Sequence, residues 1–158
     1  MKVTLDIKKP KSANYVVKGK TIAEAAKFMR DKPYAACYKA NPGYDFAKDK
    51  DGKVTSIKLK AAPTIAMPVW DGAKKLKDQE KKDWAAMMSA LQKHEDNHHK
   101  KWEKAAKDWA KTAGKRDDIT KDTVAGVMND FFTKAQGVMD KYDGSTNHGE
   151  KEGVTLPY

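Results

Sequence analysis

Two histidines and a glutamate near the middle of the chain have the types and spacing that can hold a metal ion. His94, Glu95 and His98 form the pattern H-E-x-x-H. On a helix, residues four positions apart lie on one face, so both imidazoles can reach the same ion. Glu95 lies beside them and could act as a general base toward a metal-bound water without being a ligand. The pattern therefore predicts a Zn²⁺-binding helix.

The helix that must carry these residues is predicted from an apolar stripe that begins near Asp78. The H-E-x-x-H residues fall within this stripe, whose apolar members recur at steps of three and four: Trp84, Met87, Met88, Leu91, Trp102, Ala105, Ala106 and Trp109. His94, Glu95 and His98 are therefore expected to face the core. Buried polar groups without partners are costly to desolvate, which favours a bound metal ion over a hydrogen-bonded polar cluster.

A catalytic zinc usually has three protein ligands and one open position, so a third ligand is needed. The extended pattern H-E-x-x-H-x-x-G-x-x-H is absent, because Lys101 and Lys104 hold its glycine and third-histidine places. We predict His148, the only histidine away from the motif helix, in a loop whose glycines allow close approach. An ordinary exposed histidine is the alternative interpretation. The other candidate ligands are carboxylates on a following helix, namely Asp117, Asp118, Asp122 and Asp130.

Tyr142 ends the apolar stripe of a second helix, predicted over residues 120–141, and precedes the His148 loop. Its hydroxyl could donate a hydrogen bond to a developing oxyanion, so we predict Tyr142 as a catalytic residue beside Glu95. A core aromatic with a solvated tip is the alternative. His99 points about 100° away from His98 around the helix and is expected at the surface or as a partner of a ligand.

The remaining pattern predicts an α+β fold in a single domain over residues 1–158. Residues 1–70 are predicted to be mainly β with one helix, residues 71–142 helical, and residues 143–158 loop and tail. We expect a small, mainly antiparallel sheet packed against the motif helix, with the second C-terminal helix beside it. Pro68 indicates that the short strand Thr64–Met67 lies at an edge of the sheet or ends there. An edge strand could bind an extended peptide by adding it to the sheet, and Thr64–Val69 is our candidate because it leads into the motif helix.

Composition excludes several classes of protein. The net charge is +10, but the only arginines among 32 basic residues are Arg30 and Arg116, and base readers depend on arginine's planar fork. We therefore expect no specific nucleic-acid partner. The single cysteine, Cys37, excludes an internal disulfide and a cysteine-rich zinc site. No apolar run approaches the roughly 20 residues of a membrane span, and the first residues lack the apolar region of a signal peptide.

With these residues in view, the chain resembles a bacterial family described as predicted secreted zinc-dependent proteases and catalogued as a domain of unknown function. The resemblance rests on three groups of residues beside the H-E-x-x-H core: Tyr15, Val17 and Gly19; Ile65 to Trp70; and Tyr142, Asp143, Thr146, His148 and Gly149. One departure is Asn97, where the family often has glycine. The resemblance implies a zincin-like fold, zinc held by both motif histidines with His148 as third ligand, and a secreted or periplasmic location.

We therefore predict a zinc metallopeptidase, an endopeptidase rather than an exopeptidase, that acts on a peptide or protein substrate. Glu95 would take the proton of the attacking water and later deliver it to the leaving amine. The alternative is a non-catalytic zinc-binding structural or interaction domain, in which a fourth protein ligand would close the coordination. Neither the substrate sequence nor the oligomeric state is indicated.

Overall fold

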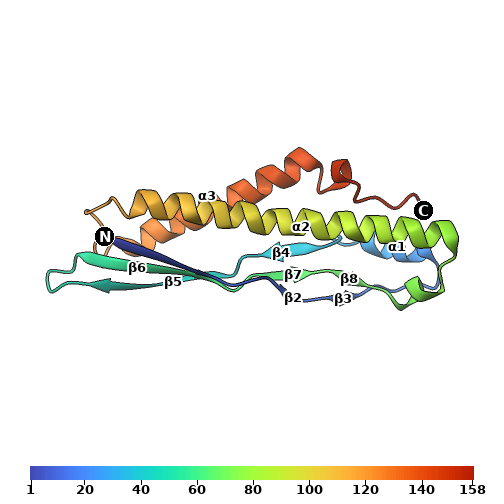
Figure 1. Cartoon of the computed structure of the whole chain (residues 1–158), viewed down its shortest axis with the longest axis horizontal. Helices are drawn as coiled ribbons and strands as arrows, with labels where there is room; N and C mark the ends of the chain where they lie inside the picture. The colour runs from blue at the N-terminus through green and yellow to red at the C-terminus, as the bar shows by residue number, and fades with distance from the viewer. The chain divides into compact units, whose positions relative to one another are not determined.

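The computed structural model describes all 158 residues and has an α+β fold with three α-helices. The helices are α1 (Ile22–Arg30), α2 (Asp78–Ala113) and α3 (Val124–Thr146), and two short 3₁₀ turns are η1 (Asp71–Lys75) and η2 (Glu150–Glu152). The strands are β1 (Lys2–Ile7), β2 (Lys11–Ser12), β3 (Tyr15–Val16), β4 (Cys37–Lys39), β5 (Pro42–Lys48), β6 (Val54–Ala61), β7 (Thr64–Ala66) and β8 (Pro68–Val69) (Figure 1).

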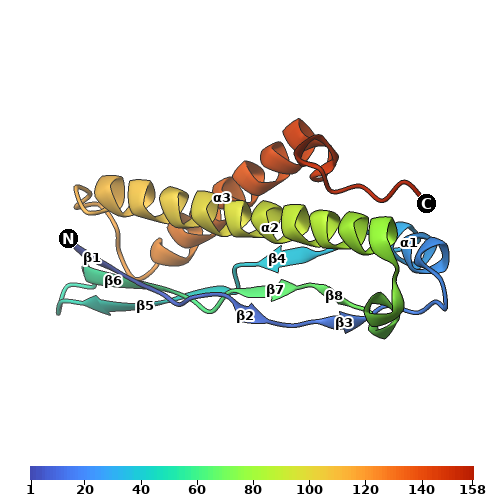
Figure 2. The same ribbon diagram turned by 45° about the vertical axis from the view of Figure 1, so that its right-hand side comes forward.

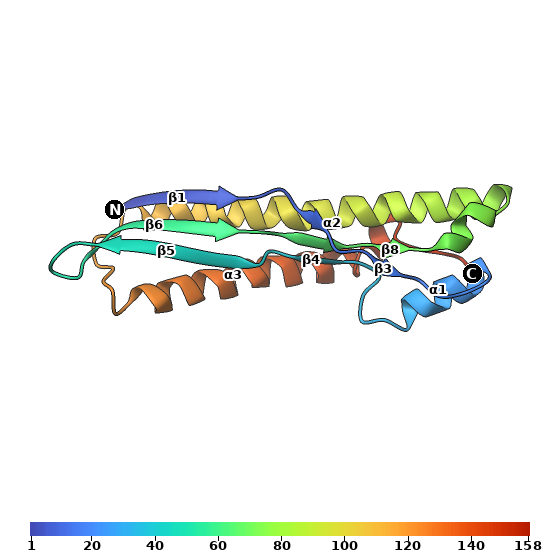
Figure 3. The ribbon, with the colours of Figure 1, turned by 90° about the horizontal axis from the view of Figure 1, so that it is seen from below.

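The chain divides into two compact units, and each is built from three separate segments. Unit 1 comprises Met1–Pro10, Ala40–Pro63 and His99–Lys141. Its sheet has the order β1-β6-β5, with β6 in the middle (Figure 3). The central strand alternates between the two faces, and its buried side chains include Ile57 and Leu59. This period of two is the reason the segment forms a strand with one face toward the unit's core.

Unit 2 comprises Lys11–Lys39, Thr64–His98 and Tyr142–Tyr158. It contains one small sheet of order β2-β7-β4 and the strand pair β3 and β8, which Figure 2 shows below the first half of α2. Helix α1 begins at a capping threonine, because the Thr21 hydroxyl accepts a hydrogen bond from the Glu24 N–H at 3.2 Å. Its buried face packs with α2 in a core that includes Met29, Met87 and Leu91.

Two features of this fold differ from the sequence-based prediction. The prediction of a mainly antiparallel sheet is wrong, because the sheets are mixed: β1 pairs with β6, β2 with β7 and β3 with β8 in parallel, whereas β5 and β4 pair antiparallel with β6 and β7. The stretch Thr64–Val69 does not form one continuous edge strand: β7 ends at Ala66, before Pro68, and Pro68–Val69 form β8, which pairs only with β3. Its first part, β7, lies between β2 and β4, so β4 forms an edge of that sheet.

The predicted loop and tail after residue 142 also contains more structure than expected. Helix α3 continues through Gly144 and ends at Thr146, and η2 follows. Val154, Leu156 and Tyr158 are half-buried against the core of unit 2. None of the helices combines the length and the apolar character that crossing a bilayer requires.

Candidate metal centre

Helix α2 carries the H-E-x-x-H residues into the interior of unit 2. His94, Glu95 and His98 are 3%, 3% and 5% exposed, so three ionisable side chains lie buried on one helix. Leu91, one turn earlier, is buried on the same face. The prediction that the motif continues the apolar stripe inward is confirmed. Burial at this level requires partners that compensate for lost water.

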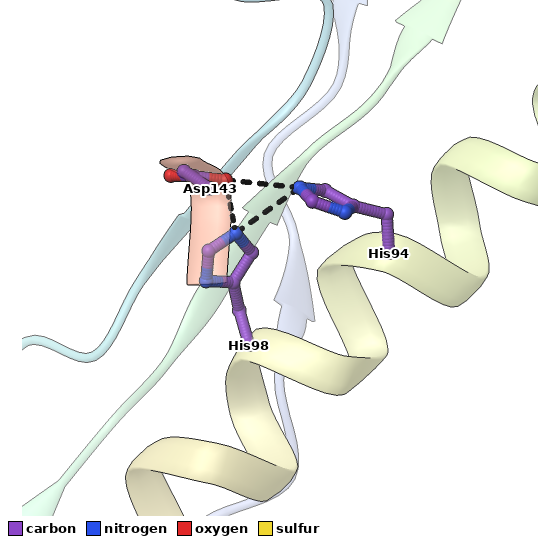
Figure 4. Close-up of side chains that lie close together, drawn as sticks. All are labelled: His94, His98 and Asp143. Atoms are coloured by element: carbon purple, nitrogen blue, oxygen red, sulfur yellow. Dashed lines mark hydrogen bonds and ion pairs between the residues drawn. The ribbon is translucent and has the colours of Figure 1, made fainter. Parts of the chain in front are cut away.

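The two histidines converge on one carboxylate oxygen (Figure 4). Their Nε2 atoms lie 3.2 Å apart, and each lies close to Oδ1 of Asp143, at 3.0 Å for His94 and 2.9 Å for His98. In a tetrahedral zinc site with bonds of about 2.0–2.1 Å, neighbouring ligand atoms lie roughly 3.3 Å apart. These three side chains therefore form a group that could hold a metal ion.

The hydrogen bonds around His94 show why a cation fits between these atoms. Its Nδ1 lies 2.7 Å from Oε2 of Glu152, which places the ring proton on Nδ1 because a carboxylate accepts. In neutral His94 the Nε2 lone pair then faces the Asp143 oxygen at 3.0 Å. Burial lowers the pKa of His98, although Asp143 opposes this, which favours the neutral imidazole that can ligate a metal ion. A cation at the centre would accept the lone pair of His94 Nε2 that otherwise faces the Asp143 oxygen.

Glu95 lies beside this group and is not part of it. Its Oε2 atom is buried without a hydrogen-bond partner, while a main-chain hydrogen bond from Tyr38 reaches the carboxylate. Burial raises the pKa of Glu95 to about 7. A carboxylate with an unpartnered oxygen and a pKa near neutrality can both accept and return a proton, which is what a general base requires.

Aromatic rings on both sides fix the imidazole planes. The Tyr142 ring stacks on His94, with centroids 4.9 Å apart and planes at 19°. The Tyr38 ring of β4 lies parallel to His98 at 6.3 Å and 4°. The Tyr142 ring also lies edge-to-face with His98, with centroids 4.9 Å apart, so this tyrosine restricts the rotation of both imidazoles.

The Tyr142 hydroxyl takes part in a network with the polar side chains around the centre. It donates to both carboxylate oxygens of Glu152, at 2.9 and 2.8 Å, and accepts from Asn97 at 3.1 Å. Burial raises the pKa of Tyr142 to about 12. Burial also acts to raise the pKa of Glu152, but the hydrogen bonds from His94 and Tyr142 outweigh it and hold that pKa below its usual value. The oxyanion-donor role of Tyr142 stays a prediction, because this hydroxyl is directed at Glu152.

The structure does not bring His148 to the two motif histidines, and Asp143 takes the third position instead. His148 is exposed in the turn after α3, with φ +51°, and lines a cavity of about 540 Å³ that Met29 and Met87 also line. His148 lies away from the motif histidines because α3 is longer than predicted. The last turns of α3 place the Asp143 carboxylate against the histidines instead. The other candidate ligands, Asp117, Asp118, Asp122 and Asp130, are all exposed. His99 is half-buried and outside the group.

Sequence reasoning therefore missed two acidic residues of the centre. Asp143 was present in the resemblance signature but was not considered as a ligand. The sequence does contain a pattern that indicates an inward-facing Asp143. This residue lies four positions after Met139 and therefore continues one edge of the α3 apolar stripe. Glu152 lies 58 residues from His94, and no helical or strand periodicity connects the two.

Comparison with known proteins agrees with the bacterial origin of the resemblance. A family described as bacterial protein of unknown function (DUF922) matches residues 12–149, and the chain belongs to this family. No curated protein and no solved structure matches the chain. The matched range includes the motif histidines, Glu95 and Asp143, and it ends before Glu152.

Proposed function

We propose that this DUF922 protein is a zinc-dependent metallopeptidase with a zincin-like active site. The observation that carries the proposal is the arrangement on α2. Two histidine Nε2 atoms and the Asp143 oxygen converge within 3.2 Å, next to a buried glutamate that keeps an unpartnered oxygen. A merely structural site would gain nothing from that oxygen, which carries a desolvation cost.

The donor set supports zinc in a catalytic rather than a structural role. His94, His98 and Asp143 would hold the ion, and two imidazoles with one carboxylate form a ligand set of known zinc hydrolases that leaves a position open. The same set also suits ferrous iron, so metal analysis is part of the test. When bound, zinc polarises a carbonyl and lowers the pKa of a water molecule at the open position.

The residues of the chain itself supply the proton transfer. Glu95 would accept the proton of the attacking water at its unpartnered Oε2 and later donate it to the leaving amine. Its pKa near 7 suits both steps, because neither protonation state is strongly favoured at neutral pH. The burial of Glu95 keeps bulk water from competing for that proton.

Strand β4 supports an extended peptide as the substrate. It forms an edge of its sheet, and its Tyr38 lies against His98 and hydrogen-bonds Glu95 through its main chain. A peptide that added to this edge would pass beside the centre with both ends free to extend, which favours an endopeptidase. β4 therefore replaces Thr64–Val69 as the proposed peptide-binding strand.

The resemblance to secreted proteases further leads us to propose action outside the cytoplasm, in the periplasm or the medium. Fractionation of cells that produce the protein from its native gene would test this. Recovery of the protein only with the cytoplasmic fraction would contradict it.

The activity is tested by comparing the wild type with Glu95→Gln in metal content and in hydrolysis of casein and of unstructured peptides. We expect one zinc per chain in both proteins, and a rate that is about 10²- to 10⁴-fold lower in the variant. Glu103→Gln makes the same substitution on the same helix at a salt-bridged surface position and should retain the wild-type rate. Equal hydrolysis by wild type and Glu95→Gln would contradict the mechanism. Zinc binding without any hydrolysis would favour the structural alternative.

A further inference from the structure

The last ten residues of the chain, Gly149–Tyr158, form a segment that we call the C-terminal strap. Every second side chain of its final part, Val154, Leu156 and Tyr158, is half-buried against the core of unit 2. Two polar contacts fix its end. The Tyr158 hydroxyl donates to Asp83 of α2 at 2.5 Å, and Arg30 of α1 donates to the Tyr158 carbonyl oxygen at 2.8 Å.

The beginning of the strap is a tight turn packed directly on His94. Gly149 has φ +88° and Gly153 has φ +93°, and η2 lies between them. A Cβ atom at Gly149 would lie 3.3 Å from Cγ of His94 and 2.7 Å from a methyl group of Val154. Only glycine permits both this backbone conformation and this approach. The turn thereby brings the Glu152 side chain to the His94 ring.

Glu152 is the link between the strap and the metal centre. Its Oε2 lies 2.7 Å from Nδ1 of His94, the ring nitrogen opposite the one that faces Asp143. The same carboxylate accepts the hydrogen bond of the Tyr142 hydroxyl, which lies 2.9 and 2.8 Å from its two oxygens, and the Tyr142 ring stacks on His94. The Glu152 side chain is 29% exposed, so it is partly shielded from water. A carboxylate on the outer nitrogen of a ligating histidine fixes its tautomer, directs its lone pair and raises its basicity.

We propose that Glu152 is a positioning residue for His94, and that docking of the C-terminal strap sets the metal affinity of the centre. This inference rests on the metal-binding part of the proposed function. Apart from Gly149, the strap lies beyond the range that the family match covers, since that range ends at residue 149. The strap therefore adds Glu152 to the surroundings of the candidate ligands His94, His98 and Asp143, although it follows all three in the chain.

The direct test is the zinc affinity of metal-free protein, measured by competition with a chromophoric chelator. We expect Glu152→Gln to bind zinc about 10- to 100-fold more weakly than the wild type. The matched control is Glu150→Gln, which removes the same charge from the same 3₁₀ turn, where the Glu150 carboxylate accepts a hydrogen bond from Asn147 and none from the metal centre. This control should bind zinc as the wild type does. Equal affinity of Glu152→Gln and wild type would overturn the inference.

A second variant separates the strap from the carboxylate itself. Tyr158→Phe removes the hydrogen bond to Asp83 and leaves Glu152 unchanged. We expect a smaller loss of zinc affinity than in Glu152→Gln, accompanied by faster proteolysis after residue 149. Wild-type zinc affinity in Tyr158→Phe together with the faster proteolysis would contradict a role for strap docking.

A third measurement keeps the inference separate from the proposed function, because it needs no metal. In metal-free wild type, nitrogen NMR should find the His94 proton on Nδ1, facing Glu152. In Glu152→Gln the Nε2-protonated tautomer should increase. If the wild type binds no zinc, but the His94 tautomer still shifts between the wild type and Glu152→Gln, the proposed function fails while the positioning of His94 by Glu152 holds. A His94 proton on Nε2 in the wild type would overturn the positioning itself.

Discussion

Replacing Glu95 by glutamine should stabilise the metal-free protein while it removes the predicted base. The glutamine keeps the length of the side chain and an oxygen that can accept the main-chain hydrogen bond from Tyr38. It removes a buried carboxylate whose Oε2 has no hydrogen-bond partner. Because the amide nitrogen of glutamine would occupy the same unpartnered position, the gain comes from removing the buried negative charge, which is costly to desolvate.

The gain should depend on pH, and its direction follows from the raised pKa of Glu95. In the native state that pKa is about 7, whereas its ordinary value is 4.5. The native state therefore keeps the proton where the unfolded chain releases it, and wild-type stability is lost as the pH rises from 4.5 through 7. Glutamine has no such loss. The advantage of Glu95→Gln should be small near pH 4.5 and reach about 3 kcal/mol at pH 8.

Urea denaturation of both proteins in the presence of a chelator, at pH 5 and pH 8, measures this difference. All other ionisable groups are common to the two proteins, so their contributions cancel in the comparison. We expect a higher free energy of unfolding for the variant at pH 8 and similar values at pH 5. Lower stability of the variant at pH 8 would refute the reasoning, because it would show that the Glu95 carboxylate contributes to folding.

Three further predictions concern residues around or away from the centre. Gly149→Ala should lower the free energy of unfolding by about 1–3 kcal/mol in urea and weaken zinc binding in chelator competition. The reason is that the new Cβ would press on Val154 and His94, at a backbone position with positive φ. Gly137→Ala lies in α3 with no neighbouring atom within 4 Å and should raise the free energy of unfolding by about 0.5–1 kcal/mol; an unchanged thermal midpoint would contradict this. Burial raises the pKa of the Cys37 thiol, so mass spectrometry should find slower alkylation at pH 8 in the native than in the unfolded protein.

The part of the site that lies on one helix could be predicted from the sequence, because helical geometry alone relates its residues. The spacing of His94 and His98 and their place in the apolar stripe required no knowledge of tertiary structure. Their inward direction and the burial of Glu95 agree with that prediction. The cap of α1 depends likewise on local sequence alone, since the interaction of Thr21 with Glu24 spans three residues.

The third member of the candidate metal group depended on where α3 ends, and local signals indicated a different residue. Glycine is common just after a helix, so Gly144 favours a helix end that would leave His148 in the loop that follows. Within the fold, Gly144 remains helical, and the positive φ angles occur later, at Asn147, His148 and Gly149. The added turn places Asp143 at the histidines. Helix boundaries of this kind are decided by packing, which a propensity for glycine at helix ends cannot reveal.

The strand pairing and the strap depended on contacts between distant segments. β2 and β7 pair in parallel across more than fifty residues, and hairpin signals predict only the antiparallel neighbours. The strap contains few apolar residues, which suggested a loose tail. Its alternating side chains and the two contacts of Tyr158 nevertheless hold it against unit 2. Two-residue strands and three alternating side chains are too short a pattern to predict either feature from the sequence.

The most direct test of the central claim is the rate of peptide hydrolysis as a function of bound zinc, measured for the wild type, Asp143→Ala and His148→Ala. The account predicts that the rate rises in proportion to occupancy up to one zinc per chain in the wild type and in His148→Ala. Asp143→Ala should bind zinc weakly and remain inactive. No hydrolysis by the wild type at full occupancy, or activity in Asp143→Ala with none in His148→Ala, would contradict it.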